Sequence, residues 1–329
     1  YVPKDGNVSA LFAGSIWVGG TDTNGQLRFA GHKFRQNGVD FYPGPLIKGG
    51  ENQGNVTPEI CTRYDRHYYV TREMVTEFRA NYDNIGEEYQ VPEVISSWPA
   101  HGPTEDQYVY YLAPFKDVDG DGSYLPSNGD YPYYIFNSAN YNCNSVPESI
   151  ADSLDNEDMQ LFGDATLWWV YNDRGNVHGE TGGEAIGMEF RAQAFAFATN
   201  DELNNMTFYN YQIINRSTYT LKEAFFGVWT DADLGYSDDD YTGCDVKRGL
   251  GYLYNGDAID DPDANPAGYG AFPPAIGIDF FEGPYKDKSF QDDLSSYNPD
   301  GILECDKGFV DVDGDGITDS IQSQDAVFD

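Results

Sequence analysis

The sequence predicts an all-β fold, mainly β with few short helices, in which long loops join antiparallel, sandwich-like sheets. Runs of strand length that are rich in Phe, Tyr, Ile, Val and Trp recur along the chain. The 36 Gly and 17 Pro among 329 residues leave few uninterrupted windows of helical length. The 26 Tyr and 20 Phe supply ring surface for a substantial core, which excludes a disordered chain.

An N-terminal hairpin is the first expected element. The apolar run at residues 11–20 ends in two glycines, and a second run follows at 27–34. Residues 21–25 between the two runs include Asn24 and Gly25, which are typical of a tight connection between antiparallel strands.

A helix is predicted at residues 71–81. Thr71 has the side-chain oxygen that an N-cap needs, while Met74, Val75 and Phe78 recur at the spacing of one helical face. This stretch is the best helix candidate in the chain, so the helical content is expected to be small.

The centre of the predicted fold is an antiparallel meander of three strands, at residues 190–199, 206–215 and 223–230. Asn, Asp and Ser between the runs favour turns. The middle run carries apolar groups on both faces, which indicates a strand that lies between two layers. Further strands are expected at residues 108–112, 167–171, 249–254 and 275–281.

Two lobes are expected, with a boundary in the polar stretch at residues 137–158. Residues 1–155 would form a loop-rich β lobe that contains the short helix. Residues 156–329 would form a β-sandwich-like lobe that ends in an Asp-rich loop. One continuous domain is the alternative, since a chain of 329 residues suits either arrangement.

The chain is strongly acidic, with a net charge of −36 from 19 Lys plus Arg and 55 Asp plus Glu. This charge argues against nucleic acid and against an anionic membrane as partners. No apolar run reaches membrane-spanning length, so direct membrane insertion is not expected. The charge instead favours Ca²⁺ as a partner.

The hexapeptide DVDGDG occurs twice, at residues 117–122 and 311–316. In calcium loops, oxygen ligands come from positions 1, 3 and 5 and from the carbonyl at position 7, with Gly at position 6 for a sharp turn. The matching ligands are Asp117, Asp119, Asp121 and the Ser123 carbonyl in the first loop, and Asp311, Asp313, Asp315 and the Ile317 carbonyl in the second. Position 12 holds no Glu in either loop, so Asp130 and Asp319 are the candidates to complete the sites.

The predicted role of Ca²⁺ is structural: each ion would staple a loop whose carboxylates otherwise repel one another. The alternative for each loop is a solvated acidic turn. A weaker third candidate is the acidic loop at residues 231–245, with Asp231, Asp233 and Asp245 as ligands. Because its acids match no known ligand register, a solvated run of charge is an equal alternative there.

The four cysteines, Cys61, Cys143, Cys244 and Cys305, form no CxxC pair. Their wide spacing disfavours a zinc knuckle or a redox pair. Two disulfides, in any of three connectivities, and buried free thiols are the open alternatives.

No catalytic residue and no enzyme activity are predicted, because the sequence has no GxSxG, HExxH, P-loop or dinucleotide-binding motif. His178 with Glu180 and Glu184 comes nearest to a proton-transfer pair, but a hydrogen-bonded structural histidine is the favoured interpretation. A glycoside hydrolase, which needs two carboxylates across a cleft, is kept as an alternative.

A glycan-binding module is the other alternative function. Trp168, Trp169 and Trp229 could form a stacking platform, but they lie inside apolar runs, which favours packing in the core. The tyrosine-rich stretch at residues 131–141 is the better glycan candidate.

Several motifs together resemble a known class of protein. In chain order they are LFAGSIWVGG at 11–20, DFYPGP at 40–45, WPAHG at 98–102, LAPF at 112–115 before the first DVDGDG, WWVYND at 168–173, and the segment 194–216. The chain resembles the N-terminal regions of large secreted Bacteroidota surface proteins that the type IX secretion system exports across the outer membrane.

The resemblance implies an extracellular, cell-surface protein without enzymatic activity, such as an adhesin, a gliding-motility protein or part of an outer-membrane assembly. It implies other cell-surface or outer-membrane proteins as partners, with surface glycans as a second class, and it carries over no functional residues. Such proteins usually end in a β-sandwich sorting domain. Nothing after Asp319 resembles one, so this sequence is expected to be a piece of a longer protein.

Overall fold

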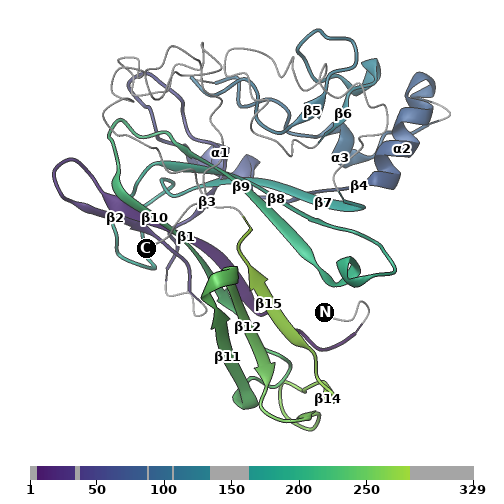
Figure 1. The fold of residues 1–329 in the computed structure, drawn as a ribbon. Coiled ribbons are helices and arrows are strands. Elements are labelled where there is room, and N and C mark those ends of the chain that lie inside the picture. The colour runs from purple at the N-terminus through teal and green to yellow at the C-terminus, as the bar shows by residue number, and fades with distance from the viewer. Residues whose placement is uncertain (1–5, 34–37, 87–88, 106, 134–162, 282–329) are drawn as a thin grey trace, which may run out of the picture.

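The structure is a computed structural model that describes residues 6–33, 38–86, 89–105, 107–133 and 163–281. Of these residues 35% lie in strands and 15% in helices, so the described structure is mainly β, which confirms the predicted fold class. Antiparallel sheets lie in layers, and the helices gather on one side of them (Figure 1).

The strands are β1 (Ala13–Thr21), β2 (Leu27–Ala30), β3 (Tyr42–Pro43), β4 (Tyr68–Thr71), β5 (Phe115–Lys116), β6 (Tyr131–Pro132), β7 (Ala165–Asn172), β8 (Met188–Ala196), β9 (Thr207–Asn215), β10 (Lys222–Asp231), β11 (Asp240–Asp245), β12 (Leu250–Asn255), β13 (Ile259–Asp260), β14 (Gly270–Ala271) and β15 (Ala275–Asp279). The α-helices are α1 (Pro58–Arg63), α2 (Arg72–Asn81) and α3 (Glu93–Ser96). Short 3₁₀ turns lie at Tyr82–Asn84, Pro126–Asn128, Glu202–Asn205, Ser237–Asp239 and Val246–Arg248.

The largest sheet has five strands, in the order β3-β7-β8-β9 with β4 also paired to β7. One of its faces is covered by α2 and α3 (Figure 1). The buried cluster on that face joins Val75 and Phe78 of α2 and Ile95 of α3 to Trp168 and Val170 of β7. These side chains form the main core, as the alternation of buried residues along β7 requires.

The opposite face of the five-stranded sheet packs on a second sheet, in which β1 lies between β10 and β2. Ile16 and Val18 of β1 meet Met188 and Phe190 of β8 there, together with Ile186. A third sheet, β11-β12-β15, has its own small cluster around Leu234 and Leu253. The layers therefore share β8 as a strand that is buried on both of its faces.

The local predictions are confirmed where the capping and turn residues were identified. Thr71 caps α2, since its hydroxyl accepts a hydrogen bond from the Met74 amide at 3.2 Å. In the β1–β2 hairpin, the Asp22 carboxylate accepts bonds from the amides of Asn24 and Gln26. The predicted strands at 167–171, 249–254 and 275–281 correspond to β7, β12 and β15.

The predicted three-stranded meander is wrong in its third strand. β8 and β9 pair as expected, but β10 pairs with β1 instead of β9. The chain bends directly after β9, where the Asn215 side chain accepts a hydrogen bond from the Ser217 amide at 2.9 Å. The chain then crosses to the second layer, where β10 completes the sheet around β1.

The predicted strand at 108–112 is also wrong. In this segment the structure has only the isolated bridge between His101 and Tyr111. The amide of Leu112 donates to the carbonyl of Ala100, and that of Gly102 to the carbonyl of Tyr110. The apolar residues therefore pack against the nearby Pro-containing corner rather than in a sheet.

Strands from both sides of residue 155 pair within the same sheets. β3 and β4 pair with β7, and β1 pairs with β10. This pairing favours one continuous domain over a division at residue 155. The stretch 137–158, where that boundary was expected, lies outside the described residues.

A buried ion cluster braces the helix-covered face of β8. Glu189 is fully buried, and its carboxylate lies 2.9 Å from Arg191 and 3.2 Å from Arg216. It also accepts a hydrogen bond from the Leu46 amide at 2.9 Å. Burial alone would raise the pKa of Glu189, but the two guanidinium groups outweigh it and hold the pKa below its ordinary value.

Candidate metal centre

The first DVDGDG segment forms the loop between β5 and β6, the two strands of a short antiparallel hairpin. Asp117 follows β5 directly and Asp130 directly precedes β6, so the hairpin fixes both ends of the loop. Gly120 and Gly122 adopt left-handed backbone angles, with φ of 75° and 79°, which the sharp turns between the acids require.

Asp117, Asp119 and Asp130 each offer a carboxylate oxygen, and the three oxygens lie within 4.8 Å of one another. Asp130 is fully buried, while Asp119 is exposed at the loop surface. Burial raises the pKa of Asp130, and the charges of Asp117 and Asp119 raise it further. A divalent cation between the three groups would remove this repulsion.

Backbone amides hold two of these carboxylates in place. The amides of Gly120 and Gly122 each donate to Asp117 at 2.8 Å, one to each oxygen. The amides of Val118 and Leu125 do the same for Asp130, also at 2.8 Å. The loop's own backbone donors therefore fix the positions of both carboxylates.

Two residues of the first loop differ from the EF-hand pattern. Asp121 accepts a bond from the Ser123 amide at 2.7 Å and does not belong to the three-carboxylate group. Asn128, at position 12, donates from its amide nitrogen to Asp119 at 2.6 Å. Asp130, which the sequence suggested as a substitute for the Glu missing at position 12, lies beside Asp117 and Asp119.

His101 ties the loop to the core. Its Nε2 accepts a hydrogen bond from the Tyr124 amide at 2.8 Å, so its Nδ1 carries the proton and donates to the Tyr110 carbonyl at 3.2 Å. The Tyr124 hydroxyl donates to the Ile95 carbonyl at 2.7 Å. Sequence reasoning missed this link, for which the Trp-Pro-Ala-His-Gly corner before the loop was the available signal.

The His101 link predicts a pH dependence of stability. Burial lowers the pKa of His101 below 6.5, so between the lowered value and 6.5 the unfolded chain binds a proton that the folded protein does not. The free energy of unfolding should therefore fall as the pH decreases through this window. His101→Gln keeps an acceptor for Tyr124 without titrating, and we expect it to flatten the profile.

Urea unfolding between about pH 7.5 and 5.5, a span chosen to bracket an ordinary histidine pKa, measures this effect. His67→Gln changes an exposed histidine and is the matched control. Equal slopes for His101→Gln, His67→Gln and the parent would contradict the assignment.

The acidic loop at 231–245 does not bring its three predicted ligands to a common point. The Asp245 carboxylate accepts a hydrogen bond from Arg248 at 2.8 Å. Asp240, whose carboxylate accepts a hydrogen bond from the Leu234 amide, lies at the opposite end of β11. Six residues of strand separate the two ends by about 16 Å. Asp233 lies near Asp231, and burial and then that neighbour raise its pKa. Within the described residues, the Asp117 group is the one three-acid cluster with metal-ligand spacing.

The second DVDGDG loop, with Asp311, Asp313, Asp315, Ile317 and Asp319, lies outside the described residues. The same is true of Cys143 and Cys305, while Cys61 and Cys244 carry free thiols. Tyr131 and Tyr133, from the stretch considered for glycans, are buried in the main core.

His178 is a buried structural residue. Its Nδ1 lies 2.7 Å from the Phe29 carbonyl and its Nε2 lies 2.6 Å from the Asp173 carbonyl. The side chains of Asp40 and Asp173, both fully buried, flank the ring at 4.0 Å and 3.6 Å. Backbone carbonyl groups therefore occupy both ring nitrogens, and the ring links the segment after β7 to β2.

Comparisons with protein families, curated proteins and solved structures show no match to the chain. Among the described residues, no helix combines the length and the apolar character needed to cross a membrane.

Proposed function

We propose that the protein is a non-enzymatic, extracellular structural or adhesive module whose 117–130 loop is stapled by Ca²⁺. The observation that carries the proposal is the convergence of Asp117, Asp119 and Asp130 at the base of the β5–β6 hairpin. The surface location and the outer-membrane or gliding-motility assembly as partner follow from the sequence resemblance.

The donor set favours Ca²⁺ over other cations. All three side chains supply hard oxygen atoms, and neither thiolate nor imidazole belongs to the group. Ca²⁺ accepts six to eight oxygen ligands in flexible geometry, so water and loop carbonyls can complete its shell. Extracellular modules bind Ca²⁺ with dissociation constants of about 10⁻⁴ to 10⁻³ M, which suits a site with an exposed acid such as Asp119.

The non-enzymatic assignment is supported by the use of the histidines in this part of the chain. Both nitrogens of His101 and both nitrogens of His178 are engaged by backbone groups. Each histidine holds one segment against another, which is a structural role.

Calcium titration with thermal unfolding tests the proposal. A ligand at 100 times its dissociation constant adds about 2.7 kcal/mol of stability, which raises Tm by roughly 5–10 °C. Asp130→Asn removes one of the three carboxylates that would bind the ion. It is expected to abolish the calcium-dependent rise in Tm that comes from this loop. The number of bound ions measured by calorimetry should fall by one.

The same variant has a second signature. Without calcium, Asp130→Asn removes the repulsion of Asp117 and Asp119 but also one of the two acceptors for the Val118 and Leu125 amides, so its Tm in chelator should stay close to that of the parent. Asp263→Asn changes an exposed acid elsewhere and is the control. An unchanged ion stoichiometry and calcium response in Asp130→Asn would overturn the proposal.

A further inference from the structure

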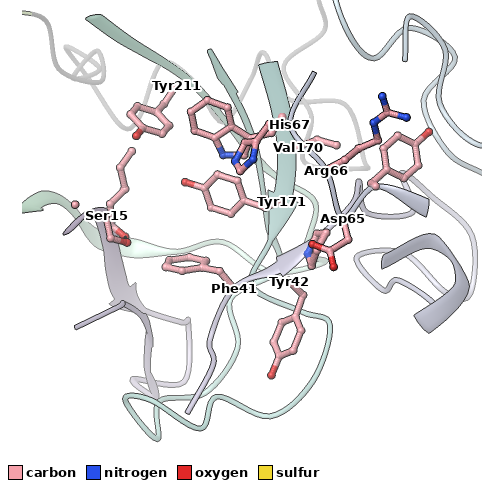
Figure 2. A pocket seen from close by; sticks show the side chains of 14 residues that line it. Ser15, Phe41, Tyr42, Asp65, Arg66, His67, Val170, Tyr171 and Tyr211 are labelled. Atoms are coloured by element: carbon pink, nitrogen blue, oxygen red, sulfur yellow. The ribbon is translucent and has the colours of Figure 1, made fainter. Parts of the chain in front are cut away.

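A pocket of about 340 Å³ opens between the five-stranded sheet and β1 (Figure 2). Its walls come from five separate parts of the chain. Residues 14–16 belong to β1, residues 41–43 include β3, residues 64–67 precede β4, and the remaining lining comes from β7 and β9. The volume lies within the range of small-molecule sites, about 300–1,000 Å³.

The register of the sheet places two rings of the pocket on one face. Trp169 of β7 pairs with Ala192 of β8, and Ala192 pairs with Tyr211 of β9. Trp169 and Tyr211 therefore point to the same side of the sheet, where both line the pocket. In the next row, Tyr171 pairs with Phe190 and forms the adjoining wall.

The rings of the pocket are held by other rings. Tyr171 is stacked on Phe190 with centroids 4.7 Å apart, and Phe41 meets both edge to face at 5.4 Å and 5.6 Å. The His67 ring lies edge-on to Trp169 at 5.3 Å. The aromatic surface is therefore fixed before any ligand arrives, which lowers the entropic cost of binding.

Two hydroxyl groups in the pocket are available. Figure 2 shows the Tyr171 and Tyr211 hydroxyls on the side where Ser15 lies. Among the described residues, neither hydroxyl makes a hydrogen bond, although each can donate one and accept others. Burial raises the pKa of Tyr211 to about 12 and that of Tyr171 well above its usual range, so both stay protonated.

We propose that this pocket binds a neutral sugar ring, independently of the calcium-stapled loop. A pyranose has an apolar C–H face that stacks on Trp169, and hydroxyl groups at its edge that pair with Tyr171 and Tyr211. Asp65 and His67, both exposed at the rim, add further polar groups.

Other ligand classes fit less well. A net charge of −36 and the rim carboxylate of Asp65 disfavour anionic ligands such as nucleotides or sulfated glycans, and Arg66, the guanidinium in the lining, is already paired with Glu93 at 3.2 Å. A purely apolar ligand would leave the Tyr171 and Tyr211 hydroxyls without partners, which costs binding free energy. A small organic cation, held by the rings, is the competing class that the experiment must separate.

The test uses three neutral glycosides: methyl β-D-glucopyranoside, methyl β-D-galactopyranoside and methyl α-D-mannopyranoside. Tetramethylammonium is the cationic probe. Saturation-transfer NMR and tryptophan fluorescence report binding. We expect at least one glycoside to bind with a dissociation constant of about 1 mM. Tyr171→Phe should weaken it about tenfold, which is the loss of one hydrogen bond. Trp169→Ala should abolish it.

Tyr252→Phe changes a hydroxyl on the third sheet and is the matched control, expected to bind as the parent does. Tyr171→Phe removes only the hydroxyl oxygen and should keep the fold. It therefore tests the sugar proposal even where Trp169→Ala fails to fold. No binding of any glycoside at about 20 mM, well above the expected constant, overturns the proposal. Preferential binding of tetramethylammonium, or equal affinity in Tyr171→Phe and parent, also overturns it.

Discussion

Glu189→Gln is expected to lower the free energy of unfolding by about 3–5 kcal/mol. The carboxylate is fully buried and is shared by Arg191 and Arg216, whose side chains are only 10% and 11% exposed. Replacing it with a neutral amide leaves two cations without a counter-charge in a place where water reaches them poorly. Urea unfolding followed by tryptophan fluorescence measures the change.

Glu105→Gln is the matched control. Glu105 lies 2.7 Å from Arg63, closer than Glu189 lies to either of its partners, but both side chains are about half exposed. Water screens this pair, so its loss should matter far less than the loss of Glu189. Comparable effects for the two substitutions would mean that burial does not set the strength of the Glu189 cluster.

Acid should reproduce part of the Glu189→Gln effect. Because the folded pKa of Glu189 lies below its ordinary value, its stabilising contribution is complete above the ordinary value of 4.5 and is lost as the pH falls through the lowered one. The parent should therefore lose stability in this acidic range more steeply than Glu189→Gln does.

Phe190→Ala is expected to cost about 3–5 kcal/mol. Its ring is fully buried, stacks on Tyr171 and meets Phe41, and contributes to the cluster that joins the two main sheets. Alanine would leave a cavity at the contact between layers, which neither sheet can close without shifting. The midpoint of urea unfolding gives the measurement.

Phe225→Ala removes the same ring from β10, where it is 61% exposed, and should change stability by less than about 0.5 kcal/mol. A loss below about 1 kcal/mol for Phe190→Ala would show that the contact between the sheets does not depend on this ring. Glu189 and Phe190 are neighbours in sequence on opposite faces of β8, so the two variants test the two layers separately.

The parts of the fold that sequence reasoning predicted are those set by neighbouring residues. The cap at Thr71, the turn after β1 and the strand-length runs all depend on short-range chemistry. The choice of partner for β10 does not depend on short-range chemistry. The apolar pattern of β10 would suit a position beside β9 as well as one beside β1. The bend at Asn215–Ser217 and the long-range pairing with β1 decide between the two positions.

The two candidate sites differ in the same way. Asp117 and Asp119 lie at fixed spacing in one loop, so the spacing alone predicts their meeting, and Asp130 needs only the short hairpin. The sugar pocket joins Ser15, His67, Tyr171 and Tyr211, which no sequence window contains. Trp169 was expected in the core, but the structure places it in the lining of this pocket.

The pairing of β1 with β10 has a consequence for how the protein is made. Thr21 and Lys222, which meet in that pairing, are 201 residues apart. At synthesis rates of about 5–20 residues per second, β1 waits roughly 10–40 s for its partner strand to emerge. During that interval the backbone edge of β1 that β10 will cover is unpaired and open to wrong partners. The β1–β2 hairpin therefore needs protection from other strand edges until β10 has been made.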